Sequence, residues 1–272
     1  MFPYYLLLGA SLAGGPFLAR RPEYRRGYLS VMGLACWLTA SMRYVTGFDY
    51  RFYESAFQSV AALGLNGAGW SEPGYLLLNW AVSFFSSDYR VFLLVFHLLL
   101  TILVFVWIGR CSPSPWLSVF LFISLQYFAL SMNFLRQALA AAIVLWIYPF
   151  LKSRRFFPAC GIVLLAACFH RTALIMLPLC FLLTLPPSKR RYGLAALAAG
   201  AAYFLMDPLI DAALLIVPKY QHYLTEKYWQ GNSFLYVLMP LGCFLISLPL
   251  LCQTVRERLS PILANSVFYA LL

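Results

Sequence analysis

Long apolar runs, separated by short polar segments, follow one another along almost the whole chain. A helix that crosses a bilayer needs about 20 mostly apolar residues. We therefore predict spanning helices at 4–19, 28–46, 91–109, 115–132, 133–151, 156–170, 172–187, 192–207 and 234–252, with a last one that begins near 261. The apolar stretch 72–87 is short and is bounded by Glu72 and Asp88, so we expect a re-entrant or interfacial half-helix on the outer side.

Composition supports a membrane location, since 62% of the residues are hydrophobic, only 11% are charged and the mean hydropathy is +0.78. Only helices and closed barrels satisfy the backbone in hydrocarbon, and a barrel would show short alternating segments. We predict an all-α fold, a polytopic transmembrane bundle of about ten helices that forms a single domain over 1–272. The last apolar run stops at the final residue, so we expect a domain truncated at its C-terminus.

The basic residues orient the bundle, because cytoplasmic loops carry an excess of Lys and Arg. If 72–87 does not cross, one side holds five basic segments, which are 20–26, Arg110, 152–155, 189–191 and 256–258. These segments contain only Glu23 and Glu257 of the nine acidic residues, so they account for the formal net charge of +11. We therefore expect no nucleic-acid partner. The positive charge follows the first apolar run, which predicts an uncleaved first helix rather than a signal peptide.

The outer side collects the unusual polar residues, and they come from five separate segments of the chain. They are Arg43, Asp49, Tyr50, Tyr53 and Glu54; Glu72, Tyr75 and Asn79; Asn133, Arg136 and Gln137; His170 and Arg171; and His222, Glu226 and Lys227. The seven cysteines show no CxxC or metal-ligand spacing, and no glycine-rich phosphate loop or Ser-His-Asp arrangement is apparent. We expect neither a metal nor a cofactor.

Arg136 is the most informative of these residues, because it lies near the start of an apolar run. Asn133, Arg136 and Gln137 are spaced i, i+3 and i+4, so one continuous helix would place them on a single polar face. Arg136 would lie roughly 5 Å inside the span. Its guanidinium either extends to the outer headgroups or binds phosphate in bidentate fashion, and we favour phosphate. Arg43 and Arg171 would join it, or would only set the topology.

The remaining candidates each allow two interpretations. Asp49 and Glu72 are candidates for a general base, although Glu72 before Pro73 also fits a helix cap and Asp49 fits a loop that bonds its own backbone. The tyrosines at 50, 53 and 75 either line a sugar-binding cleft or form an interfacial aromatic belt. His170 either binds phosphate or shuttles a proton, or it is satisfied inside the bundle.

Four motifs in order resemble the EpsG family of exopolysaccharide gene clusters, which is similar to Wzy-type polysaccharide polymerases. They are "RYVTGFDYRFY" (43–53), "EPGYLLLN" (72–79), "NFLRQALA" (133–140) and "FHRTALIMLP" (169–178). The resemblance implies a multi-pass protein of the bacterial cytoplasmic membrane. It also implies a glycosyltransferase that joins repeat units carried on undecaprenyl diphosphate at the outer face. The partners would be this lipid-linked oligosaccharide, the lipid bilayer and other exopolysaccharide export proteins.

With the resemblance, the candidate residues take roles. The catalytic set is Asp49, Glu72, Arg136 and His170, and the substrate-binding set is Arg43, Tyr50, Tyr53, Tyr75, Asn79, Asn133, Gln137 and Arg171. A flippase for lipid-linked sugars is an alternative, but it predicts charges through the depth of the bundle. A polysaccharide O-acyltransferase is another, for which His97 is the isolated candidate histidine. A non-catalytic subunit of the same machinery is the third.

Overall fold

The computed structural model describes residues 2–67, 72–185 and 189–205, and every regular element in these ranges is a helix. The chain forms two compact units, 1–178 and 179–272, which are described separately. The α-helices are α1 (Phe2–Arg20), α2 (Arg25–Ser41), α3 (Tyr50–Leu63), α4 (Pro73–Ser83), α5 (Tyr89–Cys111), α6 (Pro115–Ser124), α7 (Tyr127–Asn133), α8 (Leu135–Val144), α9 (Ile147–Lys152), α10 (Phe156–Ala167), α11 (Met176–Thr184) and α12 (Lys189–Phe204). Three short 3-10 helices are η1 (Pro22–Tyr24), η2 (Gly64–Gly67) and η3 (Arg171–Ile175).

The predicted helical class is confirmed for these residues, and the predicted spans at their positions contain helix. Two stretches, Tyr89–Cys111 and Leu135–Lys152, are long and apolar enough to cross a membrane. The pair α6 and α7, bent by 52°, makes a third if it is one span. The described part thus has fewer span-length helices than predicted, because breaks such as the left-handed Gln126 (φ 64) divide the apolar runs. The predicted spans at 234–252 and from 261 lie outside the described residues.

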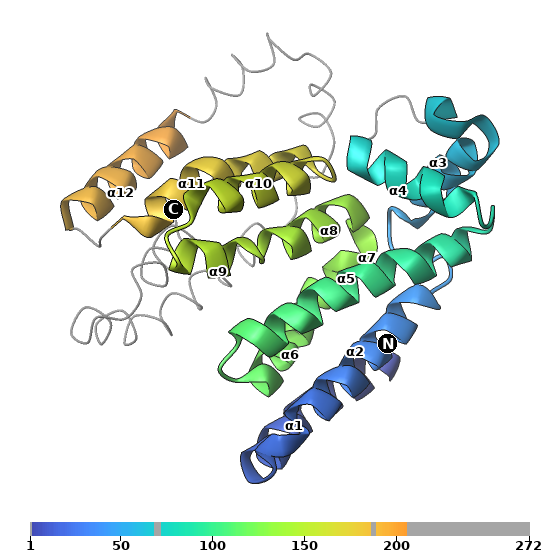
Figure 1. The fold of residues 1–272 in the computed structure, drawn as a ribbon, viewed down its shortest axis with the longest axis horizontal. Helices are drawn as coiled ribbons and strands as arrows, with labels where there is room; N and C mark the ends of the chain where they lie inside the picture. The colour runs from blue at the N-terminus through green and yellow to red at the C-terminus, as the bar shows by residue number, and fades with distance from the viewer. Residues whose placement is uncertain (1, 68–71, 186–188, 206–272) are drawn as a thin grey trace. The chain divides into compact units, whose positions relative to one another are not determined.

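In the first unit, α2 packs along α5 and α1 packs against α6. Figure 1 shows α2 and α5 running side by side. On α5, Phe92, Leu93 and Phe96 are fully buried, and the Phe92 ring packs on Phe57 of α3 and Tyr75 of α4. The Trp37 indole of α2 donates to the Leu94 carbonyl at 2.9 Å, which fixes the register of the two helices. This packed pair is the scaffold on which the shorter helices rest.

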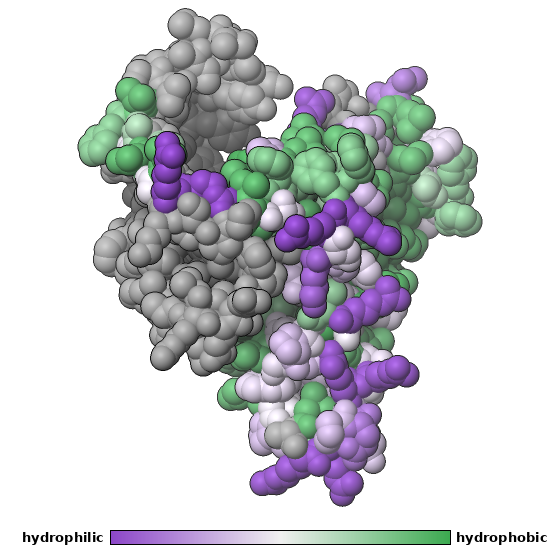
Figure 2. Space-filling view, turned by 60° about the vertical axis from the view of Figure 1, so that its left-hand side comes forward, coloured by the Kyte–Doolittle hydropathy of each residue, from purple (hydrophilic) through white to green (hydrophobic). Residues whose placement is uncertain are grey.

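One end of the scaffold is basic. The Arg25 guanidinium donates to the carbonyl oxygens of Gly109 and Ser112 at 2.9 Å each, so the turn between α1 and α2 lies beside the end of α5. Arg20 and Arg21 in this turn are exposed. Figure 2 shows hydrophilic surface gathered at the lower end of the view, which is the end that holds this turn in Figure 1. Two of the predicted cytoplasmic segments, 20–26 and Arg110, therefore share one end.

In the sequence, α3 and α4 lie between α2 and α5. They pack on each other and on α5. The α4 helix has 11 residues, far fewer than the roughly 20 of a span, in accord with the predicted half-helix at 72–87. Whether it enters the membrane stays a prediction. The α3 helix was not predicted, because its mixed polar and aromatic sequence resembles a loop rather than an apolar span. Its buried face, with Tyr53 and Phe57, meets α4 and α5.

The second unit is described at 179–185 and 189–205. It contains the end of α11 and the 16-residue α12. Leu194 and Leu197 of α12 are exposed. The site residues predicted between positions 43 and 171 belong to the first unit, so the site is described within that unit alone.

Candidate functional site

Three residues far apart in the sequence meet in one cluster. The Arg136 guanidinium donates to Glu72 Oε2 at 2.6 Å, and His170 Nδ1 lies 3.4 Å from Glu72 Oε1. The first contact is a short charge-assisted hydrogen bond, while the second is long for a hydrogen bond and is ionic when His170 is protonated. The side chains are largely buried, with 9% of Glu72, 19% of Arg136 and 24% of His170 exposed. We call Glu72, Arg136 and His170 the ionic cluster.

Local backbone geometry delivers Glu72 to this cluster. Glu72 stands at the N-cap position of α4 with Pro73 next, as the capping interpretation expects, yet its side chain makes no capping hydrogen bond. Both carboxylate oxygens face the ionic cluster instead. The start of α4 is held against the end of α10 by a hydrogen bond from Gly74 N to Cys168 O at 2.8 Å. A Cβ on Gly74 would lie 3.0 Å from that oxygen, so this contact favours glycine.

The polar face predicted for Asn133, Arg136 and Gln137 is wrong in one respect. The helix breaks at Phe134 (φ −103, ψ 64), so Asn133 ends α7 while Arg136 and Gln137 begin α8. Asn133 Nδ2 bonds weakly to the Ala129 carbonyl at 3.4 Å, and Gln137 is exposed. The break is consistent with a donor from outside the helix, because the Arg43 guanidinium donates a hydrogen bond to the carbonyl oxygen of Met132, just before the break. The three side chains thus do not form one continuous stripe.

Arg43 is buried and is not part of the ionic cluster, although Tyr75 interacts electrostatically with both Arg43 and Arg136. Only 8% of the residue is exposed, and its guanidinium also lies 5.8 Å from the Tyr50 ring centre. Among the described residues, its Nε and Nη2 make no hydrogen bond of ordinary length and angle, although the side chain interacts with Tyr89. The guanidinium also interacts electrostatically with Tyr89, Tyr50 and Tyr75. The buried cation is thus held by one backbone carbonyl and by aromatic neighbours.

The predicted tyrosines form an aromatic core rather than the wall of an open cleft. Tyr50, Tyr53 and Tyr75 are between 2% and 4% exposed. The rings of Tyr53 and Tyr75 lie 5.9 Å apart, edge to face, and Tyr50 packs on Tyr89 at 5.3 Å. Burial raises the pKa of Tyr53, while a hydrogen bond with the Arg136 side chain acts in the opposite direction. Tyr53 is therefore the tyrosine that reaches the ionic cluster.

The other predicted residues surround this core at different depths. Asn79 is buried and its amide donates to the Tyr75 carbonyl at 2.7 Å, one turn back in α4. Asp49 is half-buried at the start of α3 and makes no capping hydrogen bond. Arg171 is exposed at the start of η3. His222, Glu226 and Lys227 lie outside the described residues.

Metal binding finds no support in the described part, where no three His, Cys, Asp or Glu side chains lie close enough to hold an ion. The absence of a metal or cofactor stays a prediction. The site is rich in positive charge, because Arg136, Arg43 and, when protonated, His170 come to it from different segments of the chain. The Glu72 carboxylate lies between Arg136 and His170. Such a set suits a phosphate or diphosphate, which would compete with Glu72 for Arg136.

The Glu72 carboxylate gives the protein a specific acid sensitivity. Burial raises its pKa, but its own backbone N–H, the hydrogen bond from Arg136 and the charges of Arg136 and His170 outweigh this and lower it. Because the folded pKa is lowered, the stability that Glu72 contributes is complete above the unfolded pKa of about 4.3 and is lost as the pH falls through the folded pKa.

In detergent, the free energy of unfolding of the native chain should exceed that of Glu72→Gln by less at pH 3 than at pH 6. A difference that does not change with pH would contradict the ion pair.

Sequence reasoning identified all three members of the ionic cluster but did not pair them. It also passed over Gly47 and Gly74, which allow close approaches at Asn133 and Cys168. Both glycines stand inside the motifs quoted above, next to polar candidates, and that adjacency was the available signal.

Comparison with known proteins adds the family. No curated protein and no solved structure matches the chain. The family model of the EpsG family matches residues 27–272, well over half of the chain, and includes the whole ionic cluster. This family is associated with polysaccharide polymerisation. The four motifs, and now a match across nearly the entire sequence, lead to one conclusion: the chain belongs to the EpsG family.

Proposed function

We propose that this chain is a multi-pass glycosyltransferase of the bacterial cytoplasmic membrane. It would polymerise oligosaccharide repeat units carried on undecaprenyl diphosphate at the outer face. The observation that carries the proposal is the ionic cluster, in which Arg136 from α8 meets Glu72 and His170 from two other segments. Family membership supports the polysaccharide chemistry. The apolar helices support the membrane location.

In the reaction, the sugar–phosphate bond of the donor breaks as an acceptor hydroxyl attacks the anomeric carbon. The departing lipid diphosphate gains negative charge, and Arg136 stabilises that charge where it develops. Arg43 is buried near Tyr75, which also interacts electrostatically with Arg136, so it adds a second positive charge to this region. Arg171 is exposed and available to the outer phosphate. His170 orients either a phosphate oxygen or the Glu72 carboxylate.

The proton of the attacking hydroxyl needs an acceptor, and Asp49 fits better than Glu72. Glu72 is held by Arg136 at 2.6 Å with a lowered pKa, which makes it a weaker base. Asp49 is half-buried and lies near enough to Tyr53 to influence its ionisation, so it borders the same site. Glu72 then positions Arg136, and Asp49 takes the proton.

Purified protein tests this directly. We expect the full chain in lipid nanodiscs to elongate an undecaprenyl-diphosphate oligosaccharide, with product length read on a gel. Asp49→Asn should lower the rate at least about 100-fold, because general base catalysis contributes factors of roughly 10²–10⁴. Arg51→Gln, on the exposed Arg51–Glu54 pair of α3, is the matched control and should keep the rate. Absence of elongation by the native chain would reject the polymerase function, and full activity of Asp49→Asn would reject this base.

A further inference from the structure

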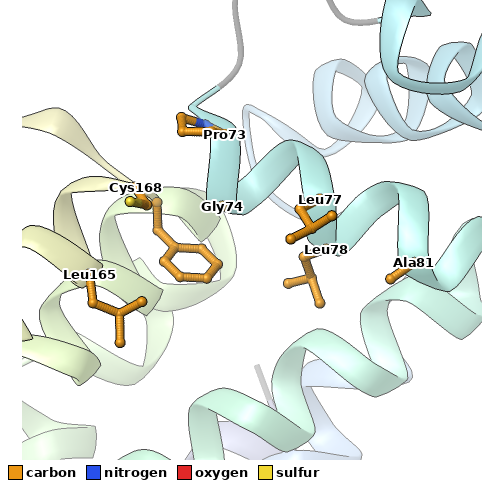
Figure 3. Close-up of a pocket in the computed structure, with 8 residues that line it drawn as sticks. Pro73, Gly74, Leu77, Leu78, Ala81, Leu165 and Cys168 are labelled. Carbon is orange, nitrogen blue, oxygen red and sulfur yellow. The ribbon is translucent and has the colours of Figure 1, made fainter.

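An apolar groove runs between α4 and the end of α10. Its walls are Pro73, Leu77 and Ala81 on one side and Leu165 and Cys168 on the other, and its volume is about 510 Å³. Figure 3 shows Leu77 and Leu78 of α4 and Leu165 of α10 directed toward the same space. Leu77 and Leu165 are each 54% exposed, so the groove is open rather than an internal cavity. Its volume lies within the usual range of ligand pockets, roughly 300–1,000 Å³.

The groove ends at the ionic cluster. Pro73 and Gly74 line it and directly follow Glu72, while Cys168 and Phe169 line it and directly precede His170. At this end the two backbones are joined by the hydrogen bond from Gly74 to Cys168. An apolar surface and a cationic site therefore meet within one or two residues on both walls. A ligand that covered both would be amphipathic, with an anionic group at one end.

The lining decides what kind of apolar group fits. Its described residues offer carbon and sulfur surface and include no charged side chain. An extended peptide would leave its backbone N–H and C=O groups unpaired there, which costs several kcal/mol per group in an apolar setting. A helix bonds its own backbone but is about 10 Å across, and the groove volume would hold little more than one turn. An aliphatic chain has neither problem.

We propose that this groove binds the aliphatic chain of a lipid diphosphate, next to its headgroup, while Arg136 holds the diphosphate. The proposal rests on the proposed function for the headgroup, and it adds a separate subsite for the lipid. Charge complementarity fixes the orientation, with the anionic end at Arg136 and the chain directed along α4 past Leu77 toward Ala81. In a bilayer the chain moves from one apolar surrounding to another, so the affinity would come chiefly from the diphosphate at Arg136, and packing of the chain against the groove would add to it.

The native cysteines provide the first test. Cys168 lines the groove, whereas Cys160 lies on the same helix, is similarly half-buried and does not line it. We expect a polyisoprenyl diphosphate to slow alkylation of Cys168 in the native chain by roughly tenfold or more, and to leave Cys160 unchanged. Inorganic pyrophosphate should protect neither thiol, and an uncharged polyisoprenol should protect Cys168 only at higher concentration. An unchanged Cys168 rate with the polyisoprenyl diphosphate would overturn the proposal.

Two neighbouring leucines provide a matched pair of variants. Leu165 lines the groove and Leu164 does not, yet they are 54% and 53% exposed. Leu165→Trp should fill the groove and weaken binding of the polyisoprenyl diphosphate roughly tenfold or more, without changing pyrophosphate binding. Leu164→Trp should leave both unchanged. Equal binding by the two variants would overturn the lipid subsite.

These outcomes separate the subsite from the polymerase function. Groove-dependent binding in a chain that makes no polymer would reject the proposed function and keep the lipid subsite. Polymer formation by a chain whose lipid binding does not depend on the groove would keep the proposed function and reject the lipid subsite.

Discussion

Replacing Arg136 by glutamine should lower polymer formation in cells at least about 100-fold, the usual cost of losing a group that stabilises a developing anion. The same change leaves the Glu72 carboxylate, 9% exposed, without its strongest partner. We therefore also expect a loss of stability of about 2–4 kcal/mol, somewhat below that of fully buried pairs because 19% of the Arg136 side chain is exposed. Polymer length on a gel and protein abundance in the membrane measure the two effects.

A double variant separates catalysis from folding. In Glu72→Gln with Arg136→Gln, two neutral amides replace the ion pair, so no buried charge is left alone and abundance should recover. Polymer formation should remain low, because the cation that binds the diphosphate is still absent. Full-length polymer from the double variant would show that Arg136 only holds the fold. Arg51→Gln, which breaks an exposed pair, should change neither measurement.

Replacing Gly47 by alanine should destabilise the first unit by about 2–4 kcal/mol. Gly47 has φ +101, a backbone conformation that L-residues rarely adopt, and a Cβ there would overlap Asn133 Oδ1. The glycine stands in the loop that carries both Arg43 and Asp49, so a shift of this loop should also lower polymer formation. Thermal unfolding in detergent and the nanodisc assay measure the two losses.

Gly64 supplies the control for this prediction. It has φ +64, but a Cβ there meets nothing within 4 Å, so Gly64→Ala carries backbone strain without a clash. We expect Gly47→Ala to be the more harmful change. Adding Asn133→Ala to Gly47→Ala should recover the part of the loss that comes from the overlap. Equal losses at Gly47 and Gly64, with no recovery in the double variant, would mean that the loop does not press on the end of α7.

The helical class followed from the sequence alone because hydrophobicity in long runs is a local property. Each apolar segment satisfies its own backbone as a helix, whatever its neighbours do. The positions of α5 (Tyr89–Cys111) and of the span-length stretch Leu135–Lys152 were accordingly predicted to within a few residues. The short α4 was also predicted, since Glu72 and Asp88 limit the apolar stretch on both sides.

The positions of the helix breaks depend on contacts between distant parts of the chain, which a local sequence pattern does not show. The break at Gln126, inside the predicted span 115–132, was missed. The division between α7 and α8 lies within two residues of the predicted boundary between 132 and 133, but Asn133 was assigned to the wrong side of it. The Met132 carbonyl just before this break bonds to Arg43, which is 89 residues earlier in the chain. The helix α3 was missed for the opposite reason, because its stability comes from burying Tyr53 and Phe57 against α4 and α5 rather than from an apolar run.

The candidate site, too, depended partly on the sequence and partly on the tertiary structure. The sequence by itself determined which residues are exceptional, because an arginine, a carboxylate and a histidine beside apolar runs are costly unless they are paired or used. It did not determine their partners. Only the tertiary structure decided that Glu72 turns from its own helix end toward Arg136 and His170, and that Tyr50, Tyr53 and Tyr75 form a buried core. Pairing depends on distances between segments roughly 35 to 100 residues apart, and those distances are set by helix packing.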